Sequence, residues 1–163
     1  MTPFHLLAVL VWISVSLLSA GAQNPTAKKE AFKPTDEEQA IIDLTNKERE
    51  KLKLPPLKAN EKLFQAAKVH SANMAKQNML VHELDGKNPA HRVRATGYAY
   101  AFIGENVAWN QRSPEQLLKE WMESEHHRAN ILDRRFREIG IGIAMNDQGE
   151  PYYTQVFGTP RGR

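Results

Sequence analysis

The chain has 163 residues, a formal net charge of +3 and an isoelectric point near 9.2, with Lys and Arg spread among almost as many carboxylates. This spread argues against nucleic-acid binding, which concentrates basic residues in a run or stripe. The densest basic cluster, Arg134, Arg135 and Arg137, is flanked by Asp133 and Glu138, which favours a solvated, locally paired surface over a site for an anionic polymer. Because the chain lacks cysteine, disulfides, thiolate metal sites and lipidated cysteines are excluded.

The N-terminal segment has the pattern of an export signal. Leu6 to Leu18 is almost wholly apolar and leads into the small residues Ser19 to Ala22. We predict a signal peptide over residues 1–22 and a secreted or cell-envelope protein with no stable membrane insertion after cleavage. An uncleaved anchor stays open as an alternative, since no Lys or Arg precedes the apolar core.

The rest of the chain is predicted to form one domain behind a tether. Residues 23–34 are polar and Lys-rich with two prolines, which predicts a flexible linker. Residues 35–163 remain for a single domain, and a mature chain of roughly 140 residues is long enough to bury its own core.

Capping signals predict the helices in chain order. Thr35 and Glu38 have the spacing of a capping box, and this first helix should end before Pro55. Asn60 can cap a second helix that runs to about Met79. Two further helices are predicted over Pro89 to Ala95 and from the Ser113-Pro114 pair onward.

A change of period after Phe136 predicts strands. Ile139 to Met145 alternates bulky residues with Gly140, Gly142 and Ala144, so one face of this strand is nearly bare and invites close packing. A turn at residues 146–149 and a second strand over Tyr152 to Phe157 complete an antiparallel hairpin. We therefore predict an α+β fold in which helices enclose a small, mainly antiparallel sheet.

Seven ordered motifs give the chain a family resemblance. It resembles the CAP or SCP superfamily, which groups cysteine-rich secretory proteins, insect venom antigen 5 and plant pathogenesis-related proteins, and within it the bacterial secreted branch. The resemblance implies a three-layer α-β-α sandwich. The motifs that carry it are Asn46-Lys47-Glu48-Arg49 with Leu54-Pro55-Pro56-Leu57, Leu80-Val81-His82, Gly97-Tyr98, Gly104-Glu105-Asn106-Val107-Ala108, Trp121-Met122 with His127-Arg128-Ala129-Asn130-Ile131-Leu132, Ile139-Gly140-Ile141-Gly142 and Tyr153-Thr154-Gln155-Val156-Phe157.

The resemblance also implies a set of site residues. Animal and plant members carry two histidines and two glutamates in a central cleft, a tetrad able to hold a divalent metal such as zinc. His82 matches the first histidine and Glu105 the first glutamate, whereas Tyr152 stands at the second histidine and the second glutamate falls near Ser124. Bacterial relatives typically carry a histidine in the segment of His127, so we expect a cleft built on His82, Glu105 and His127.

Two chemistries are open for these residues. Two imidazoles and one carboxylate meet the ligand count of a zinc site with an open water position. No compact His-Glu-x-x-His motif is present, however, so a metal-free hydrogen-bonded cleft is favoured and no cofactor is required. In that cleft Glu105 either orients His82 for proton transfer or binds backbone amides of a neighbouring loop. Ser124, three residues before His127, is a weaker nucleophile candidate, because no nucleophile elbow surrounds it and a cap or turn role is favoured.

Other residues near the motifs are given structural roles. Asn106 is expected to pin its own turn, His70 to be a core histidine, His126 to face solvent, and Arg128 with Asn130 to brace the loop. Trp109 and Trp121 are predicted core anchors, with sugar stacking by an exposed Trp109 as the alternative. Tyr153 and Gln155 share one face of the last strand, and alternation alone leaves open whether that face lines the cleft.

Two functions are consistent with the sequence. The favoured one is a secreted module that binds a lipid, glycan, peptide or divalent metal in its cleft without turnover. The alternative is an extracellular hydrolase, metal-assisted or using a His/Glu acid-base pair, that acts on peptide, lipid or cell-wall substrates. The lack of a clear nucleophile favours binding.

Overall fold

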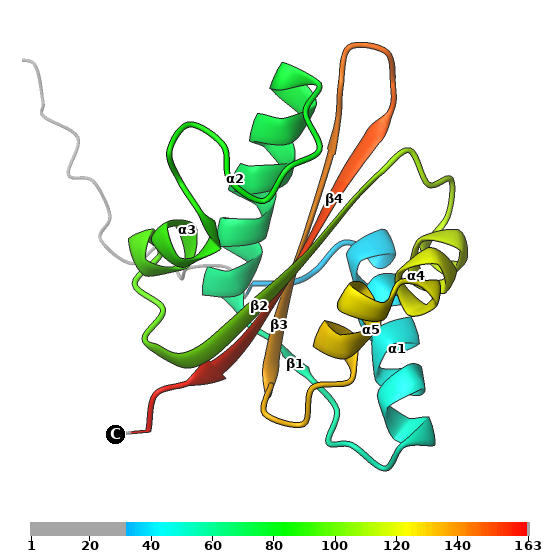
Figure 1. Ribbon diagram of the computed structural model, residues 1–163, viewed down its shortest axis with the longest axis vertical. Helices are drawn as coiled ribbons and strands as arrows, with labels where there is room; N and C mark the ends of the chain where they lie inside the picture. The colour runs from blue at the N-terminus through cyan, green and yellow to red at the C-terminus, as the bar shows by residue number, and fades with distance from the viewer. Residues whose placement is uncertain (1–31, 163) are drawn as a thin grey trace, which may run out of the picture. The chain divides into compact units, whose positions relative to one another are not determined.

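A computed structural model describes residues 32–162 as a four-stranded sheet between two layers of helices (Figure 1). The strand order is β1-β3-β4-β2, with β1 parallel to β3 and the other neighbours antiparallel. Helices α2 and α3 cover one face of the sheet, and α1, α4 and α5 cover the other. This arrangement confirms the predicted α-β-α sandwich. The elements are α1 (Asp36–Lys51), β1 (Lys58–Ala59), α2 (Glu61–Gln77), α3 (Pro89–Ala95), β2 (Tyr100–Trp109), α4 (Pro114–Glu123), α5 (Glu125–Ile131), β3 (Glu138–Met145) and β4 (Pro151–Pro160).

The helix starts follow the capping signals of the sequence. The Thr35 hydroxyl accepts from the Glu38 amide at 3.2 Å, and the Glu38 carboxylate accepts from the Thr35 amide at 2.8 Å, which confirms the predicted capping box. Asn60 caps α2 as predicted. Three residues before Thr35, the Phe32 ring packs edge-on against Phe64 with centroids 4.8 Å apart. The predicted signal peptide and most of the predicted linker lie outside the described residues.

Strand β2 and helix α5 are two elements that sequence analysis did not predict. The centre of β2, Gly104 to Asn106, is polar, so it lacks the apolar alternation of a half-buried strand. Asn106 was expected to pin its own turn, which is wrong. Its Nδ2 donates instead to the His127 carbonyl at 3.1 Å and to Gln155 Oε1 at 3.0 Å, so it ties β2 to α5 and β4.

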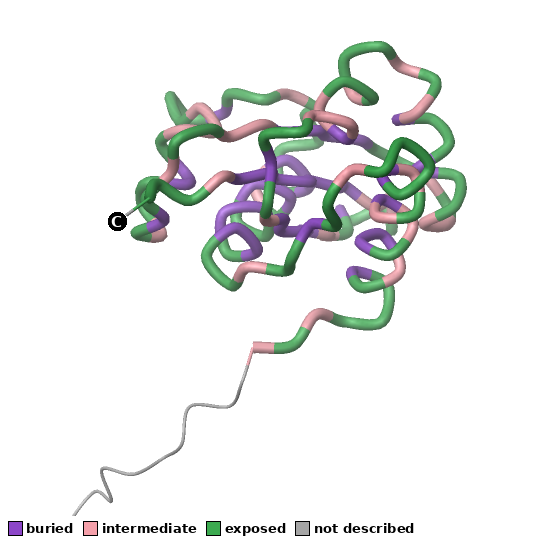
Figure 2. The backbone as a smooth tube through the Cα atoms, turned by 90° about the horizontal axis from the view of Figure 1, so that it is seen from below, coloured by how far each residue is buried: buried purple, intermediate pink, exposed green. Residues whose placement is uncertain are grey.

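The bare face of β3 brings α2 into contact with the sheet backbone. A Cβ atom at Gly140 would lie 2.1 Å from the Leu63 carbonyl carbon, and one at Gly142 would lie 2.3 Å from that of Ala67. Ser71 then reaches the sheet, where its hydroxyl donates to the Gly142 carbonyl at 2.9 Å. The buried residues accordingly concentrate on the central strands and the helix faces that cover them (Figure 2).

The opposite layer is joined by a buried arginine. Arg49 of α1 is fully buried, and its guanidinium donates to the carbonyls of Ile131 at 2.7 Å and Asp133 at 3.0 Å. It also donates to Pro55 at 3.0 Å and to Phe136 at 3.3 Å. One side chain thus fixes the end of α5 and the following loop against α1. Among residues 32–162, the helices lack the combination of length and apolarity needed to cross a bilayer.

We expect Gly142→Ala to destabilise the protein by roughly 3 kcal/mol, because the new methyl group overlaps the backbone of α2. Gly162→Ala is the matched control, since a Cβ there meets nothing within 4 Å, and it should change stability by less than about 0.5 kcal/mol. Urea denaturation of the two variants measures this difference. Equal stability of the two variants would contradict the close packing of α2 on β3.

Candidate functional site

The site centres on a buried carboxylate, Glu105, which projects from β2 toward the layer of α2 and α3. Its side chain is 3% exposed. Oε1 lies 3.0 Å from His82 Nδ1, and Oε2 accepts from Arg92 Nη2 at 2.7 Å. The predicted contact between His82 and Glu105 is therefore present, and the guanidinium of Arg92 balances the charge of the carboxylate.

Arg92 of α3 also fixes the loop that carries His82. Its Nη1 donates to the Lys87 carbonyl at 2.6 Å, and its Nη2 donates to the His82 carbonyl at 2.9 Å. The His82 side chain is nevertheless 53% exposed, and within residues 32–162 no hydrogen bond engages its Nε2. Glu105 thus orients one ring nitrogen while the other side of the ring faces solvent. Sequence analysis missed Arg92, because an arginine in a short helix gives no sign of a buried partner.

His70 of α2 is a second imidazole beside Glu105. The residue is 1% exposed, and its Nε2 lies 2.8 Å from the Val81 carbonyl and 3.8 Å from Glu105 Oε1. Burial lowers the pKa of His70, although the charge of Glu105 opposes that shift. The prediction of a core histidine is confirmed.

His127 approaches from the other helical layer. It lies on α5, its carbonyl accepts from Asn106, and its ring centroid is 6.4 Å from that of Trp121. Burial lowers the pKa of His127, and the positive charges of His82 and His126 lower it further. No hydrogen bond among the described residues joins the rings of His82 and His127.

A pocket of about 240 Å³ opens beside His127 at the C-terminal end of β2. Two of its apolar residues are well exposed, Leu80 by 46% and Trp109 by 39%. Trp121 is a buried anchor as predicted, whereas Trp109 is exposed and lies beside Tyr152 with ring centroids 6.2 Å apart. The complete lining is Leu80, Val107, Ala108, Trp109, Gln111, Glu120, Trp121, Ser124 and His127.

Side chains of α4 and α5 cover the outer edge of β2 next to this pocket. Trp121 Nε1 donates to the Val107 carbonyl at 3.3 Å, and Asn130 Nδ2 donates to the Glu105 carbonyl at 3.1 Å. The predicted bracing role of Asn130 is confirmed. Since these two carbonyls are engaged, they are not open to pairing with an extended peptide.

Ser124 lies at the junction of α4 and α5, where it ends one helix and precedes the next. Its side chain makes no capping hydrogen bond to α5. Among the described residues no hydrogen bond joins its hydroxyl to His82 or His127. Ser124 thus has the predicted turn position but no side-chain cap on α5, and the geometry of an activated nucleophile is not present there.

The remaining sequence candidates are buried. Tyr152 is 3% exposed on the same sheet face as Glu105, where it packs with Met74 and Val107.

Tyr153 and Gln155 lie on the opposite face, 2% and 0% exposed. The Tyr153 hydroxyl donates to the Gln111 carbonyl at 3.0 Å, and burial raises its pKa to about 12. Gln155 Nε2 donates to Thr45 Oγ1 at 2.9 Å. Alternation had left open whether the face of Tyr153 and Gln155 lines a cleft, and the structure shows these two side chains and that of Tyr152 buried between the sheet and its helices.

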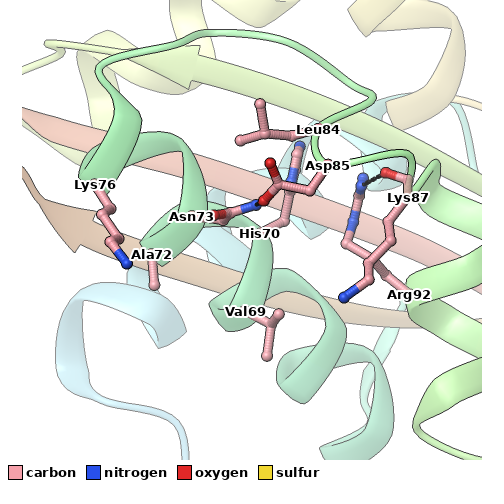
Figure 3. Close-up of a pocket in the computed structure, with 9 residues that line it drawn as sticks. All are labelled: Val69, His70, Ala72, Asn73, Lys76, Leu84, Asp85, Lys87 and Arg92. Atoms are coloured by element: carbon pink, nitrogen blue, oxygen red, sulfur yellow. Dashed lines mark hydrogen bonds between the residues drawn. The ribbon is translucent and has the colours of Figure 1, made fainter.

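A further pocket, of about 410 Å³, lies between α2 and the loop that follows it (Figure 3). His70 and Arg92 contribute to its wall together with Asp85 and Lys87. Asp85 is held across the pocket by Asn73 Nδ2 at 2.8 Å. Sequence analysis did not anticipate this pocket, because its residues come from segments without a recognisable motif.

The arrangement does not fit the zinc site that the resemblance implies. Within residues 32–162, no three His, Cys, Asp or Glu side chains form a group able to hold a metal. Both oxygens of Glu105 are engaged, one of them by a guanidinium, whose charge opposes a nearby divalent cation. Zinc at His82, Glu105 and His127 therefore stays a prediction from sequence that this geometry does not favour.

These features define a CAP-type sandwich with a polar network at the edge of its sheet, and sequence comparison gives the same result. The sequence model of the cysteine-rich secretory protein (CAP) family matches residues 42–157, so the chain belongs to this family. The Bacillus subtilis protein YkwD, itself uncharacterized, is 39% identical over 121 residues, which cover 74% of this chain. The chain spans 46% of YkwD, so it corresponds to about half of that relative.

Solved structures share the fold. An extracellular protein containing an SCP domain from Bacillus anthracis is 30% identical with a TM-score of 0.67, and the match covers 75% of this chain and 40% of that chain. An outer surface protein of Borrelia burgdorferi is 18% identical with a TM-score of 0.71, covering 76% of this chain and 92% of that chain. At 18% identity, the match to the Borrelia burgdorferi protein shows only that the two chains share a fold.

We expect the protein to lose stability as the pH falls below about 6.5, the pKa of an unfolded histidine. Because folding lowers the pKa of His70, the stability of the neutral ring is fully present above the unfolded pKa and is lost as the pH falls through it toward the folded pKa. The loss due to His70 can reach about 1.4 kcal/mol at pH 5.5. Urea denaturation between pH 7.5 and 5.5 measures it.

His70→Gln should flatten this dependence, since an amide can still donate to the Val81 carbonyl without titrating. His91→Gln serves as the control, because His91 is exposed on α3 and its side chain contacts neither Glu105 nor His127 among the described residues. An identical pH slope in the wild type and in His70→Gln would contradict the assignment.

Proposed function

We propose that the protein is an exported binding module whose pocket at the end of β2 holds one unit of a glycan or peptide without turning it over. The supporting observation is the pairing of an exposed aromatic pocket with a polar network that lacks an activated nucleophile. Export is supported by the N-terminal signal pattern and by the extracellular SCP-domain relative.

The size and lining of the pocket favour a small, partly apolar group. Its volume of about 240 Å³ is below the roughly 300–1,000 Å³ typical of pockets for drug-sized ligands. A single sugar ring or one large side chain suits this volume better than a whole lipid. Trp109 offers a ring face for stacking, and Gln111, Ser124 and His127 offer hydrogen-bond partners around it.

The state of Glu105 favours binding over catalysis. A general base must be within reach of the substrate, but the Glu105 side chain is 3% exposed and its two oxygens already contact His82 and Arg92. What remains is an orienting role toward His82.

We expect the purified protein to bind soluble muropeptides, which carry both a sugar and a peptide part, in a saturable way. Trp109→Ala should weaken this binding about tenfold or more, because it removes the exposed ring of the pocket. Leu52→Ala is the matched control, since Leu52 is an exposed apolar residue outside the pocket. Calorimetric titration with the intact fragments, and with their glycan and peptide parts separately, identifies the part that is recognised.

Two outcomes would contradict the proposal. One is the absence of saturable binding to any of these fragments. The other is equal weakening by Trp109→Ala and Leu52→Ala. The same titration is repeated with phospholipid vesicles. Binding to the vesicles and to none of the fragments would assign the pocket to a lipid instead.

One observation supports the alternative function, a hydrolase. The 3.0 Å contact between Glu105 and His82 Nδ1 orients a half-exposed imidazole, which is the geometry of a base held by a carboxylate. In such an enzyme His82 would take a proton from a water molecule, since Ser124 is not bonded to it.

If the alternative holds, muropeptides are cleaved over hours, and His82→Ala abolishes cleavage while the thermal melting temperature is maintained. Mass spectrometry of the fragments measures this. His91→Ala is the control, because His91 is an exposed histidine on α3 without a contact to Glu105. We expect no cleavage by the wild type, and turnover that depends on His82 would replace the binding proposal.

A further inference from the structure

Three segments that are remote in sequence carry arginines to one end of the sheet (Figure 1). The loop after α5 is tied to the end of β4, since the Thr159 hydroxyl donates to the Arg135 carbonyl at 2.6 Å and the Arg137 amide donates to the Gly158 carbonyl at 3.0 Å. The Arg161 amide donates to the Ala99 carbonyl at 3.0 Å, which joins the end of β4 to the start of β2. We call the resulting surface the arginine face, and its members are Arg94, Arg134, Arg135, Arg137 and Arg161.

The arginine face concentrates positive charge far beyond the average of the chain. Its members are five of the ten arginines in the sequence, and each of them is exposed. The same segments carry two carboxylates, of which Asp133 pairs with Arg135 and Glu138 accepts from the neutral Tyr98 hydroxyl, so five arginines face two acidic side chains. Within residues 32–162, the side chains of Arg134 and Arg161 make no hydrogen bond or ion pair. The local charge is therefore available to a partner.

Aromatic rings hold two of these guanidinium groups in place. The Arg94 guanidinium lies 5.6 Å from the centre of the Tyr100 ring, and that of Arg135 lies 4.7 Å from the centre of the Phe102 ring. A cation–π contact with a ring restrains a guanidinium while its N–H groups can still donate. In Arg135 the Nε and Nη2 groups are used by Asp133, so its Nη1 is the group that remains.

A bulge in β2 distributes these rings over both faces of the sheet. Tyr100 pairs with Pro160 and Phe102 with Thr159, so one extra residue lies between them. Tyr100 packs with the cluster beneath α2 and α3, whereas Gly104, two residues after Phe102, faces Phe136 and Asn130 of the opposite layer. The arginines consequently extend around the end of the sheet, which suits a long partner better than a compact ion.

A pocket of about 270 Å³ gives this surface a defined subsite. It is lined by Arg94 and Arg161 together with Tyr98, Ala99 and Tyr100. Two guanidinium groups around a tyrosine-lined floor match a phosphate or carboxylate group, to which each can donate paired hydrogen bonds.

We propose that the arginine face binds a linear anionic glycopolymer, that is, a sugar chain bearing repeated phosphate or carboxylate groups. Nucleic acid fits less well, because single-stranded bases stack on aromatic faces and an arginine already occupies one face of each of the Tyr100 and Phe102 rings. This binding is independent of the pocket proposed above for glycan or peptide units, which lies at the other end of β2.

The test measures binding of the purified protein to two immobilised polymers. A polyol-phosphate wall polymer supplies phosphate groups and polygalacturonate supplies carboxylate groups, and neutral dextran is the blank. We expect saturable binding to at least one polyanion at near-physiological salt, weakening steadily as salt rises. The double variant Arg94→Glu with Arg161→Glu should weaken it about tenfold or more. The matched control is Lys51→Glu with Lys119→Glu, which makes the same change of net charge at exposed positions elsewhere.

Further variants separate the proposal from general charge effects. Arg94→Lys with Arg161→Lys keeps the charge but removes the planar fork, so an intermediate loss supports paired hydrogen bonding. If the glutamate double variant melts at a lower temperature than the wild type, Arg134→Glu replaces it, because this exposed side chain makes no bond that folding requires. Trp109→Ala should bind the polymers normally.

Three results would overturn the proposal. They are no binding to either polymer, equal weakening by the lysine control, and tighter binding to single-stranded DNA than to both polymers. A loss of polymer binding in Trp109→Ala would count against independent surfaces and assign the polymer to the pocket.

Discussion

The pairing of Glu105 with Arg92 is the constraint on which the site depends. A buried carboxylate without a partner costs several kcal/mol, so the position of Glu105 in β2 requires a cation nearby. Arg92 meets this need from α3, and the same guanidinium holds the carbonyls of Lys87 and His82. One ion pair thereby joins a strand, a short helix and the loop between α2 and α3. The orientation of His82 is a consequence of this pairing.

The two helical layers reach β2 by different means. On one face, the glycines of β3 allow α2 to approach the sheet backbone, which places His70 beside Glu105. On the other face, Arg49 holds the end of α5, and Asn130 and Trp121 cover the outer carbonyls of β2. Edge strands expose such groups to pairing with other chains, so this cover protects the edge and at the same time forms the wall of the pocket.

Local signals predicted much of the fold, whereas the site depends on contacts that a sequence does not display. The capping box at Thr35, the cap at Asn60 and the hairpin around Gly149 follow from residues within a few positions of one another. The motif resemblance led to His82 and Glu105, and the structure places them in contact.

The missed parts have a common physical cause. Strand β2 was not predicted because two of its buried side chains, Glu105 and Asn106, are polar and their partners lie in other segments. Arg92 and Arg161 give no signal by themselves, since each acquires its role only from residues brought near by folding. Tyr153 and Gln155 share a strand face that alternation identifies, but only the packing of α1 shows that this face is sealed.

The two surfaces proposed for binding lie at opposite ends of one strand. The arginine face surrounds the start of β2 at Tyr100, and the pocket surrounds its end at Trp109. Ten extended residues separate these ends by about 30 Å, since each adds roughly 3.3 Å. A polymer held at the arginine face therefore leaves the pocket accessible, and it raises the local concentration of any unit attached to the same polymer. A weak pocket of about 240 Å³ gains from such an arrangement, because its small contact area alone limits the affinity it can reach.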